Sequence, residues 1–299
     1  MSASIGTFGA LGIGTADPVT QRLNYESEDF TRKDEVIDGN GIRGTRSSDI
    51  ELQRDSLQRI DGPVSLIPTA LEFTYLLDWI LGGTGAAGVY PLGDVLSTRY
   101  VTIDRKTKVY TYTGVGVNKA TFKASRGTAL KVDLDLVGQT SAVANSGTFP
   151  AIDLDITTKP FIFSDLTITV NGTTVSTNEF EVTVDNKIDK DRYFNSLNLT
   201  AINALDREVM FKSSLPYGDH EAIRAAMNAG SNGLAVVATF TNGNTSIVFT
   251  LPAVAVPMHE PGTPGRVEIM LPVEGRAFRK GRGTGGDARE LVINLDSTP

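Results

Sequence analysis

The sequence contains no cysteine, which excludes both a disulfide framework and a metal site held by thiolates. Its only histidines, His220 and His259, lack the spacing of a metal-binding pair, so we expect surface histidines and no metal. No apolar run approaches the roughly 18 residues that a membrane-spanning helix needs. The first residues also lack a charged start followed by an apolar stretch. We therefore expect no membrane partner and no secretory signal.

Catalytic signatures are missing as well. The glycines at 9, 12 and 14 and at 281, 283, 285 and 286 neither follow a strand nor open a helix at the spacing of a phosphate loop. No Gly-x-Ser-x-Gly sequence provides a nucleophile elbow. Carboxylates lie close together at 153–155 and at 185–191, and the second set lacks the glycine and final glutamate of a calcium loop. We expect no enzyme activity, no catalytic residue and no cofactor.

Charge is of mixed sign with an acidic excess. The 28 basic and 35 acidic residues give a net charge of −7, and 40% of the residues are apolar. This balance supports a globular chain with a sizeable core. It disfavours a protein that grips nucleic acid by neutralising phosphates.

A pattern of strand, helix and glycine occurs twice. In the first copy, Ala70, Phe73, Leu77 and Ile80 share one helical stripe within residues 69–81, and Gly82 ends the helix. In the second copy, a strand at 208–212 leads to an expected helix over 219–229, closed by a glycine at 230. The sequence therefore predicts two units with one helix each.

Alternating apolar and polar residues predict strands through most of the remaining chain. The ranges are 42–54, 62–68, 100–104, 108–113, 117–124, 130–137, 166–170, 180–184, 197–202, 209–212, 234–241, 245–251, 267–273 and 291–295. Turns are expected at 105–107, at Asn171-Gly172 and at 242–244. The predicted fold class is mainly β, with two tandem β-sandwich or barrel units.

Composition also suggests boundaries along the chain. Residues 1–35 are rich in glycine, serine and threonine and then in charge, which predicts an extended N-terminal arm. Residues 36–140 form the first predicted unit, the serine- and glycine-rich segment 141–160 a linker, and residues 161–299 the second unit.

Two charged clusters are candidate interaction sites. Basic residues gather in a glycine-rich loop, where we weigh a solvated loop against a contact with an acidic face of a neighbouring subunit: Arg276, Arg279, Lys280 and Arg282. A second cluster of mixed sign is expected at a hairpin tip: Asp185, Lys187, Asp189, Lys190 and Asp191.

The arrangement resembles the tail tube (major tail) proteins of long-tailed, non-contractile bacteriophages. The resemblance is carried by the strand and helix of residues 62–83, the strands that follow, and the stretch 234–252. It extends over about residues 40–296 and rests on pattern and helix style.

The resemblance implies a structural subunit that polymerises as stacked rings around a lumen, each unit completing a β-barrel tube on oligomerisation. Its partners would be further copies of itself, tape-measure and tail-end proteins, and DNA that passes without specific binding during ejection. With two units per chain, three copies in a pseudo-sixfold ring are favoured and six copies are the alternative. The protein would lie in the virion tail, assembled in the bacterial cytoplasm.

On that basis we predict luminal hairpins at about 42–52 with its return strand and at about 180–202, the second containing the mixed-charge cluster. The arm before residue 35 and the loops 83–93 and 257–286 are candidates for contacts between rings.

Two other classes remain open. A surface-displayed carbohydrate-binding or adhesive β-sandwich would need exposed aromatic platforms. The single Trp79 lies in a predicted helix, and Tyr90, Tyr100, Tyr110 and Tyr112 fall in one region where packing is the commoner role. An enzyme on a jelly-roll scaffold has no supporting residue spacing.

Overall fold

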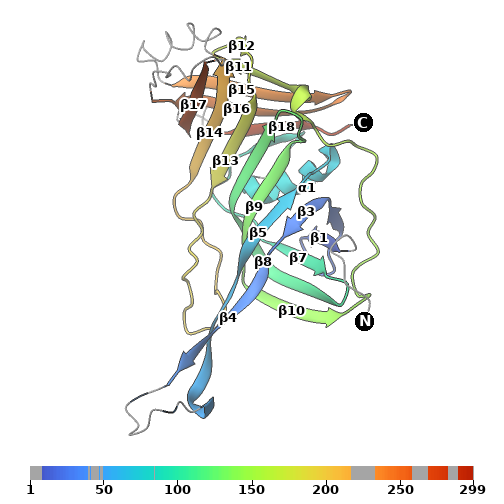
Figure 1. Ribbon diagram of the computed structural model, residues 1–299, viewed down its shortest axis with the longest axis vertical. Helices are drawn as coiled ribbons and strands as arrows, with labels where there is room; N and C mark the ends of the chain where they lie inside the picture. The colour runs from blue at the N-terminus through green and yellow to red at the C-terminus, as the bar shows by residue number, and fades with distance from the viewer. Residues whose placement is uncertain are drawn as a thin grey trace.

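A computed structural model of the chain describes residues 9–39, 41, 47, 50–83, 85–216, 233–257, 269–281 and 289–298. The fold is mainly β, as the alternating sequence predicts, and its strands form layers around one interior (Figure 1). A long hairpin, formed by β4 (Thr31–Asp38) and β5 (Gln53–Leu66), projects from this body.

The smaller sheet has the order β2–β1–β7–β8–β10, with all pairs antiparallel. Its strands are β1 (Ala10–Gly14), β2 (Gln21–Leu23), β7 (Arg99–Asp104), the first part of β8 (Lys108–Ser125) and β10 (Thr140–Asn145). The turn predicted at 105–107 joins β7 to β8. The two strands predicted at 108–113 and 117–124 are one continuous strand, because β8 passes from this sheet into the larger one.

The larger sheet runs in the order β5–β9–β8–β13–β14–β17, again antiparallel throughout. It adds β9 (Lys131–Gly138), β13 (Glu179–Asp185), β14 (Glu208–Pro216) and β17 (Met270–Phe278). The strand β3 (Tyr25–Glu28) continues the line of β4 along β5. Residues before and after the predicted linker therefore share one sheet, joined at β8 and β13.

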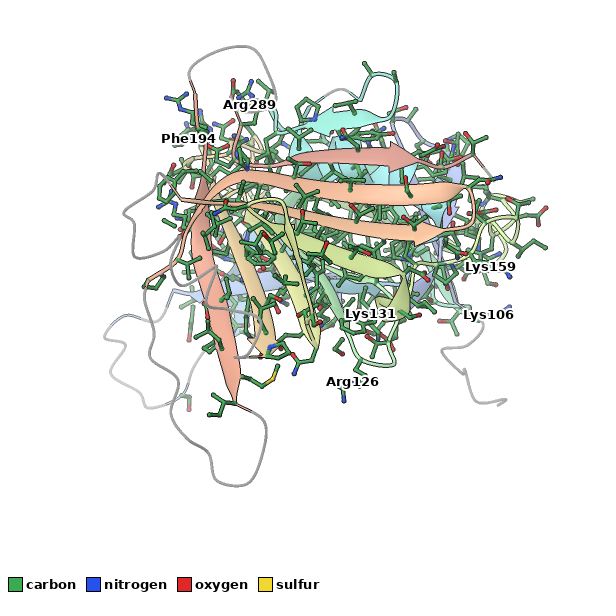
Figure 2. All side chains as sticks on the ribbon, turned by 90° about the horizontal axis from the view of Figure 1, so that it is seen from above. Lys106, Arg126, Lys131, Lys159, Phe194 and Arg289 are labelled. Atoms are coloured by element: carbon green, nitrogen blue, oxygen red, sulfur yellow. The ribbon has the colours of Figure 1, made fainter. Side chains whose placement is uncertain are left out.

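A further layer covers the inner side of this sheet. It is built from β16 (Thr245–Ala255), which pairs with β15 (Leu234–Asn242) on one side and with β17 and β18 (Val292–Asp296) on the other. The short strands β11 (Leu166–Val170), β12 (Thr173–Val175) and β6 (Val89–Pro91) lie at its borders. Figure 2 shows strands of this layer crossing those of the larger sheet. The turns predicted at Asn171-Gly172 and 242–244 are confirmed.

The helix α1 (Ala70–Leu81) confirms the first predicted helix. Thr69 and Glu72 form a capping box, and Gly82 ends the helix with a left-handed φ of 70° and an N–H bond to the Asp78 carbonyl. Trp79 is buried and its indole Nε1 donates to the Val115 carbonyl at 2.9 Å. It cannot serve as the exposed platform that a carbohydrate-binding protein would need. The helix predicted over 219–229 lies outside the described residues.

One hydrophobic core runs through both halves, from Leu11 to Leu295. Its centre is a group of phenylalanines in which Phe180 lies 5.3 Å from both Phe240 and Phe249 by ring centroids. Phe122 from the first half also contacts Phe249 at 5.2 Å. The halves are therefore packed together through shared aromatic contacts.

Several expectations need correction. Residues 10–35 do not form an arm: they form strands β1–β3 and much of β4, and Leu11 and Ile13 are buried in the core. The alternation at Ile50 and Leu52 is one 3₁₀ turn, η2 (Ile50–Leu52), and not a strand. Residues 197–202 also form no strand. Neither residues 50–52 nor residues 197–202 have a described strand paired beside them. Without such pairing, alternate side chains are not held on opposite faces of a sheet.

The predicted linker is tied down. Its Asp155 accepts hydrogen bonds from Thr69 Oγ1 at 2.8 Å and from the Thr157 backbone at 2.8 Å, as well as from Thr158 Oγ1. Thr158 Oγ1 in turn accepts from the Leu71 N–H at 3.2 Å. A second 3₁₀ turn, η3 (Phe163–Asp165), follows before β11. The segment 146–160 is a connection clasped to the start of α1.

Candidate assembly surface

The larger sheet has a polar outer face, because alternate residues of each strand point away from the core. In β13, Phe180, Val182 and Val184 are buried, whereas Glu179 and Glu181 face outward. The strand register continues this face across the neighbouring strands. We call the outward side chains of β9, β8, β13, β14 and β17 the polar face.

Charges of both signs lie side by side across the polar face. One row, read by strand register, contains Lys131, Lys123, Glu181, Lys212 and Glu274. In total, seven carboxylates stand against five cations; the carboxylates are Asp133, Asp135, Glu179, Glu181, Asp185, Glu208 and Glu274, and the cations Lys119, Lys123, Lys131, Lys212 and Arg276. The strand side chains of the polar face thus carry a small acidic excess, and two of their carboxylates, Glu208 and Asp135, pair with Lys187 and Lys190 of the connection that follows β13.

Ion pairs neutralise several of its lysines. Lys123 contacts Asp133 on the neighbouring strand, and Lys131 Nζ lies 2.6 Å from Glu26 Oε2. Lys190, from the segment after β13, lies 3.1 Å from Asp135. Such exposed pairs add little stability. Their effect is to occupy lysines that would otherwise be available to an anion.

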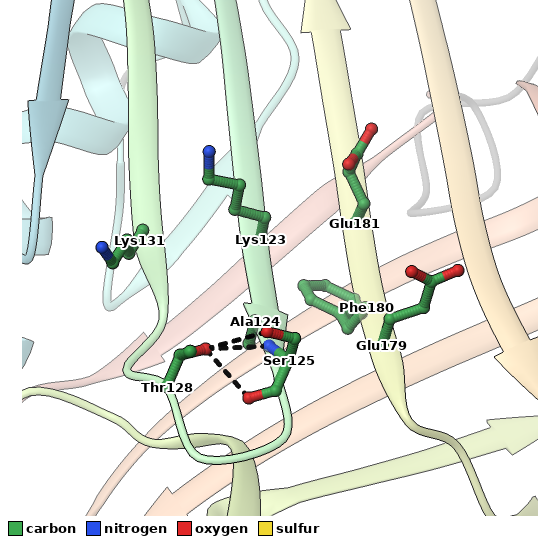
Figure 3. A pocket seen from close by; sticks show the side chains of 8 residues that line it. All are labelled: Lys123, Ala124, Ser125, Thr128, Lys131, Glu179, Phe180 and Glu181. Carbon is green, nitrogen blue, oxygen red and sulfur yellow. Dashed lines mark hydrogen bonds between the residues drawn. The ribbon is translucent and has the colours of Figure 1, made fainter.

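A shallow hollow of about 290 Å³ lies on this face, between the ends of β8, β9 and β13 (Figure 3). Lys123 and Lys131 lie on one side of it, and Glu179 and Glu181 on the other. The turn below is closed by Thr128 Oγ1, which donates to the Ser125 carbonyl at 2.9 Å. The hollow contains no nucleophile paired with a base and therefore offers no catalytic arrangement.

Within the described ranges, no group of three or more His, Asp or Glu side chains is placed to hold a metal ion. No described helix is long and apolar enough to cross a membrane.

Two borders of the larger sheet carry unpaired backbone groups in the part of the chain that the structure describes. At one border, β4 pairs with β5 alone. At the other, β17 pairs with β14 through residues 270–276 and with β16 only through residues 276–278. Open strand borders are places where another chain can add a strand.

The described part of the projecting hairpin has a charged stem and, further out, several exposed apolar side chains. In the stem, Arg32 pairs with Asp34 at 2.6 Å, and Lys33 with Asp61 at 2.8 Å. Toward the end, four apolar side chains are exposed: Val36 (55%), Ile37 (60%), Ile50 (75%) and Leu52 (44%). Exposed apolar side chains that gather in one part of a polar protein are candidates for a contact with another molecule. Sequence reasoning placed a hairpin here but did not identify these exposed residues together.

The predicted basic cluster is only partly gathered. Arg276 belongs to the polar face, where its guanidinium lies 3.9 Å from Asp206 and 5.4 Å from the Phe278 ring centroid. Arg279 and Lys280 are exposed just beyond β17. Arg282 lies outside the described residues. A contact with a neighbouring subunit remains a prediction for this cluster.

The mixed-charge cluster 185–191 lies at the start of the long connection that joins the antiparallel strands β13 and β14, and not in a tight turn. Asp185 ends β13, and residues 186–207 then form a long irregular connection before β14. Lys187 lies 2.9 Å from Glu208, a hydrogen bond that raises the pKa of Lys187 and lowers that of Glu208. Asp191 pairs with Arg59 of the hairpin stem at 3.2 Å. The charges are thus partners of the sheet and the stem.

In the described residues, the open sheet borders, the projecting hairpin and the polar face without a catalytic arrangement are features of a structural β protein. The sequence profile of the phage tail tube protein family matches residues 3–277, so the chain belongs to that family. No curated protein matches the chain. As a family member it is a structural subunit of a phage tail tube and a component of the virion tail.

Proposed function

We propose that copies of this chain close into rings that stack along an axis, and that the resulting tube conducts DNA during ejection. The observation that carries the proposal is the pair of open borders, β4 and β17, on opposite ends of one curved sheet. Pairing between the β17 border of one copy and the β4 border of the next would remove both. Three copies, or six, would then surround a lumen.

The larger sheet favours three copies in a pseudo-sixfold ring. The first half of the chain contributes the neighbouring strands β5, β9 and β8, and the second half contributes β13, β14 and β17. The two sets meet where β8 pairs with β13. In the proposed ring, each chain would supply two sets of three neighbouring strands to a closed barrel.

The polar face is the surface proposed to line the lumen. Its excess of carboxylates repels a polyphosphate, and its paired lysines are already engaged by neighbouring carboxylates. A conduit must not bind the DNA that passes through it. Tape-measure and tail-end proteins would set the length of the filament, since head-to-tail stacking has no end of its own.

The described part of the β4–β5 hairpin, which the sequence interpretation placed in the lumen, is now the proposed contact between rings. It lies well outside the body of the subunit (Figure 1) and exposes apolar side chains that a second copy would cover. Arg279 and Lys280 are proposed as further cationic contacts, through which salt would weaken assembly.

Electron microscopy of the purified chain tests assembly directly. We expect rings or tubes with a central channel. Discrete monomers at high concentration, together with virions whose tails lack this chain, would refute the proposal.

The lumen is tested by the double variant Glu181→Lys/Glu274→Lys, which turns the polar face from two excess negative charges to two excess positive ones. Tubes of this variant should retain DNA at low salt and release it as salt rises. The matched control, Asp153→Lys/Asp296→Lys, changes the net charge equally away from the polar face. Equal retention by both variants would show that the polar face does not line the lumen.

A further inference from the structure

The connection of residues 186–207 packs against the sheet through its own small apolar cluster. Ile188 and Leu199 of the connection are buried against Val137 of β9, and Tyr193, Ile202 and Leu96 pack around them. This cluster lies on the outer side of the sheet, beside the polar face and separate from the main core. The connection is therefore seated on the sheet although it contains no strand.

Gly116 explains how the connection fits so closely. It stands opposite Val137 in the β8–β9 pair. A Cβ at this position would lie 2.6 Å from Ile202 Cγ2 and 3.2 Å from Ile188 Cδ1. Carbon atoms pack favourably at about 3.5–4.0 Å, so only glycine admits Ile202 here.

The same connection contacts the stem of the projecting hairpin. The Gln58 N–H donates to the Leu197 carbonyl at 2.7 Å. Arg59 Nε donates to Glu35 on β4 at 2.7 Å, and its Nη1 donates to Asp191 of the connection at 3.2 Å. The Arg59 guanidinium also lies 5.7 Å from the Tyr193 ring centroid. Arg59 thus joins both strands of the stem to the connection.

Without these contacts the outer part of the stem would have no packing partner in the described structure apart from its own two strands. Residues 53–59 of β5 have β4 on one side but lie beyond the β5–β9 pairing, which begins at Ile60. An isolated two-stranded hairpin is only marginally stable in water. Figure 1 shows the connection descending beside the stem.

We propose that residues 186–207 form a brace that holds the β4–β5 hairpin at one angle to the sheet, and that Arg59 and Gly116 are its positioning residues. The inference rests on the proposed function, in which the hairpin contacts a second copy. A hairpin held in its docking orientation loses less conformational freedom on binding, which strengthens the contact without adding any new one.

Hydrogen exchange of the unassembled chain, followed by mass spectrometry on peptides covering residues 53–60, measures the brace without reference to assembly. In Arg59→Ala, exchange in this segment should become about three- to fivefold faster, the loss expected for an exposed ionic contact. In Gly116→Ala, the new methyl group displaces Ile202, and exchange should become at least about tenfold faster.

Two further variants separate bracing from general damage. Gly116→Ala/Ile202→Ala removes the colliding Cγ2 and should return exchange toward the wild-type rate. Arg32→Ala removes an ion pair confined to β4 in the same hairpin, and should leave exchange unchanged. Exchange that does not respond to Arg59→Ala or to Gly116→Ala, or that responds equally to Arg32→Ala, would overturn the brace.

Assembly provides the second measurement. If the brace orients the hairpin, tubes of Arg59→Ala should form several-fold more slowly while the thermal midpoint of the monomer stays within about 1–2 °C, a small change for a chain of this size. If Arg59→Ala makes hydrogen exchange faster but leaves the assembly rate unchanged, the brace stabilises the hairpin in the monomer and has no role in docking. A wild-type chain that never assembles, yet shows the expected exchange pattern, would refute the proposed function and leave the brace standing.

Discussion

The sandwich interior and the projecting hairpin use apolar side chains in opposite ways. In the interior, Phe180 contacts Phe211, Phe240 and Phe249 and is excluded from water. At the end of the hairpin, Ile37 and Ile50 are more than half exposed. The interior residues stabilise the subunit by their own burial. The hairpin residues become buried only if another molecule covers them. Substitutions in the interior should therefore change the stability of the subunit, whereas substitutions in the hairpin should change its assembly.

Of the substitutions that test this comparison, Phe180→Ala should change stability the most. The change removes a ring that contacts three others and leaves a cavity that rigid neighbouring strands cannot fill. We expect a loss of about 3–5 kcal/mol in the free energy of unfolding, measured by urea denaturation with Trp79 fluorescence. A loss below about 1 kcal/mol would show that the shared aromatic core does not join the two halves.

A smaller loss, about 1–3 kcal/mol, is expected for Asp155→Asn, which weakens the clasp between residues 146–160 and the start of α1. Burial alone would raise the pKa of Asp155, but the hydrogen bonds from Thr157, Thr158 and Thr69 outweigh it and hold the pKa well below its usual range. A depressed pKa contributes stability above the unfolded value, near 3.8, and this stability is lost as the pH falls below it. Wild type and variant should therefore converge in acid denaturation, and parallel curves would contradict the clasp.

Glu72, at the same end of the helix, should show the opposite dependence of stability on pH. Its carboxylate is fully buried and accepts from the N–H groups of Asn24 and Thr69, both at 2.7 Å. Burial raises its pKa above the usual 4.5 in spite of these bonds. A raised pKa makes the folded state the stronger proton binder, so this group's contribution falls as the pH rises from 4.5 through the folded value. Relative to Glu72→Gln, the wild type should lose stability across that window, and a gain would contradict the assignment.

The smallest effect on folding is expected for Ile37→Ser at the hairpin end. Because the side chain is exposed in the subunit, the free energy of unfolding should change by no more than about 0.5 kcal/mol. Tube formation, measured by light scattering, should nevertheless weaken by at least about tenfold in critical concentration if a second copy covers the residue. Val143→Ser, at an equally exposed site on β10, is the matched control. Equal effects of the two changes on assembly would remove the special role of the hairpin.

Local pattern predicted the elements better than their connections. The spacing of Phe73, Leu77 and Ile80 and the position of Gly82 defined α1 correctly, because helical geometry repeats within a few residues. Alternation likewise located β9, β13, β15 and β16. The same alternation misled at Ile50 and Leu52, where no partner strand lies opposite.

The candidate surface was harder to predict from the sequence than the strands and the helix. The charges of residues 185–191 were recognised and placed in a loop between strands, but their partners Arg59, Asp135 and Glu208, which lie on other strands, could not be foreseen. Arg276 was noted as part of a loop cluster and is instead part of the polar face. Cross-strand register decides such neighbours, and register is set by pairing between distant segments.

The sequence by itself determined a mainly β chain with a capped helix, no cysteine chemistry and a resemblance to phage tail tube proteins. These features follow from composition and from backbone periodicities that act within a few residues. The tertiary structure alone decided that β8 passes between two sheets, that β13 joins it, that Asp155 clasps the helix, and that Gly116 leaves room for Ile202. Those outcomes depend on contacts between residues far apart in the chain, where strand pairing and side-chain volume, rather than local propensity, select the neighbours.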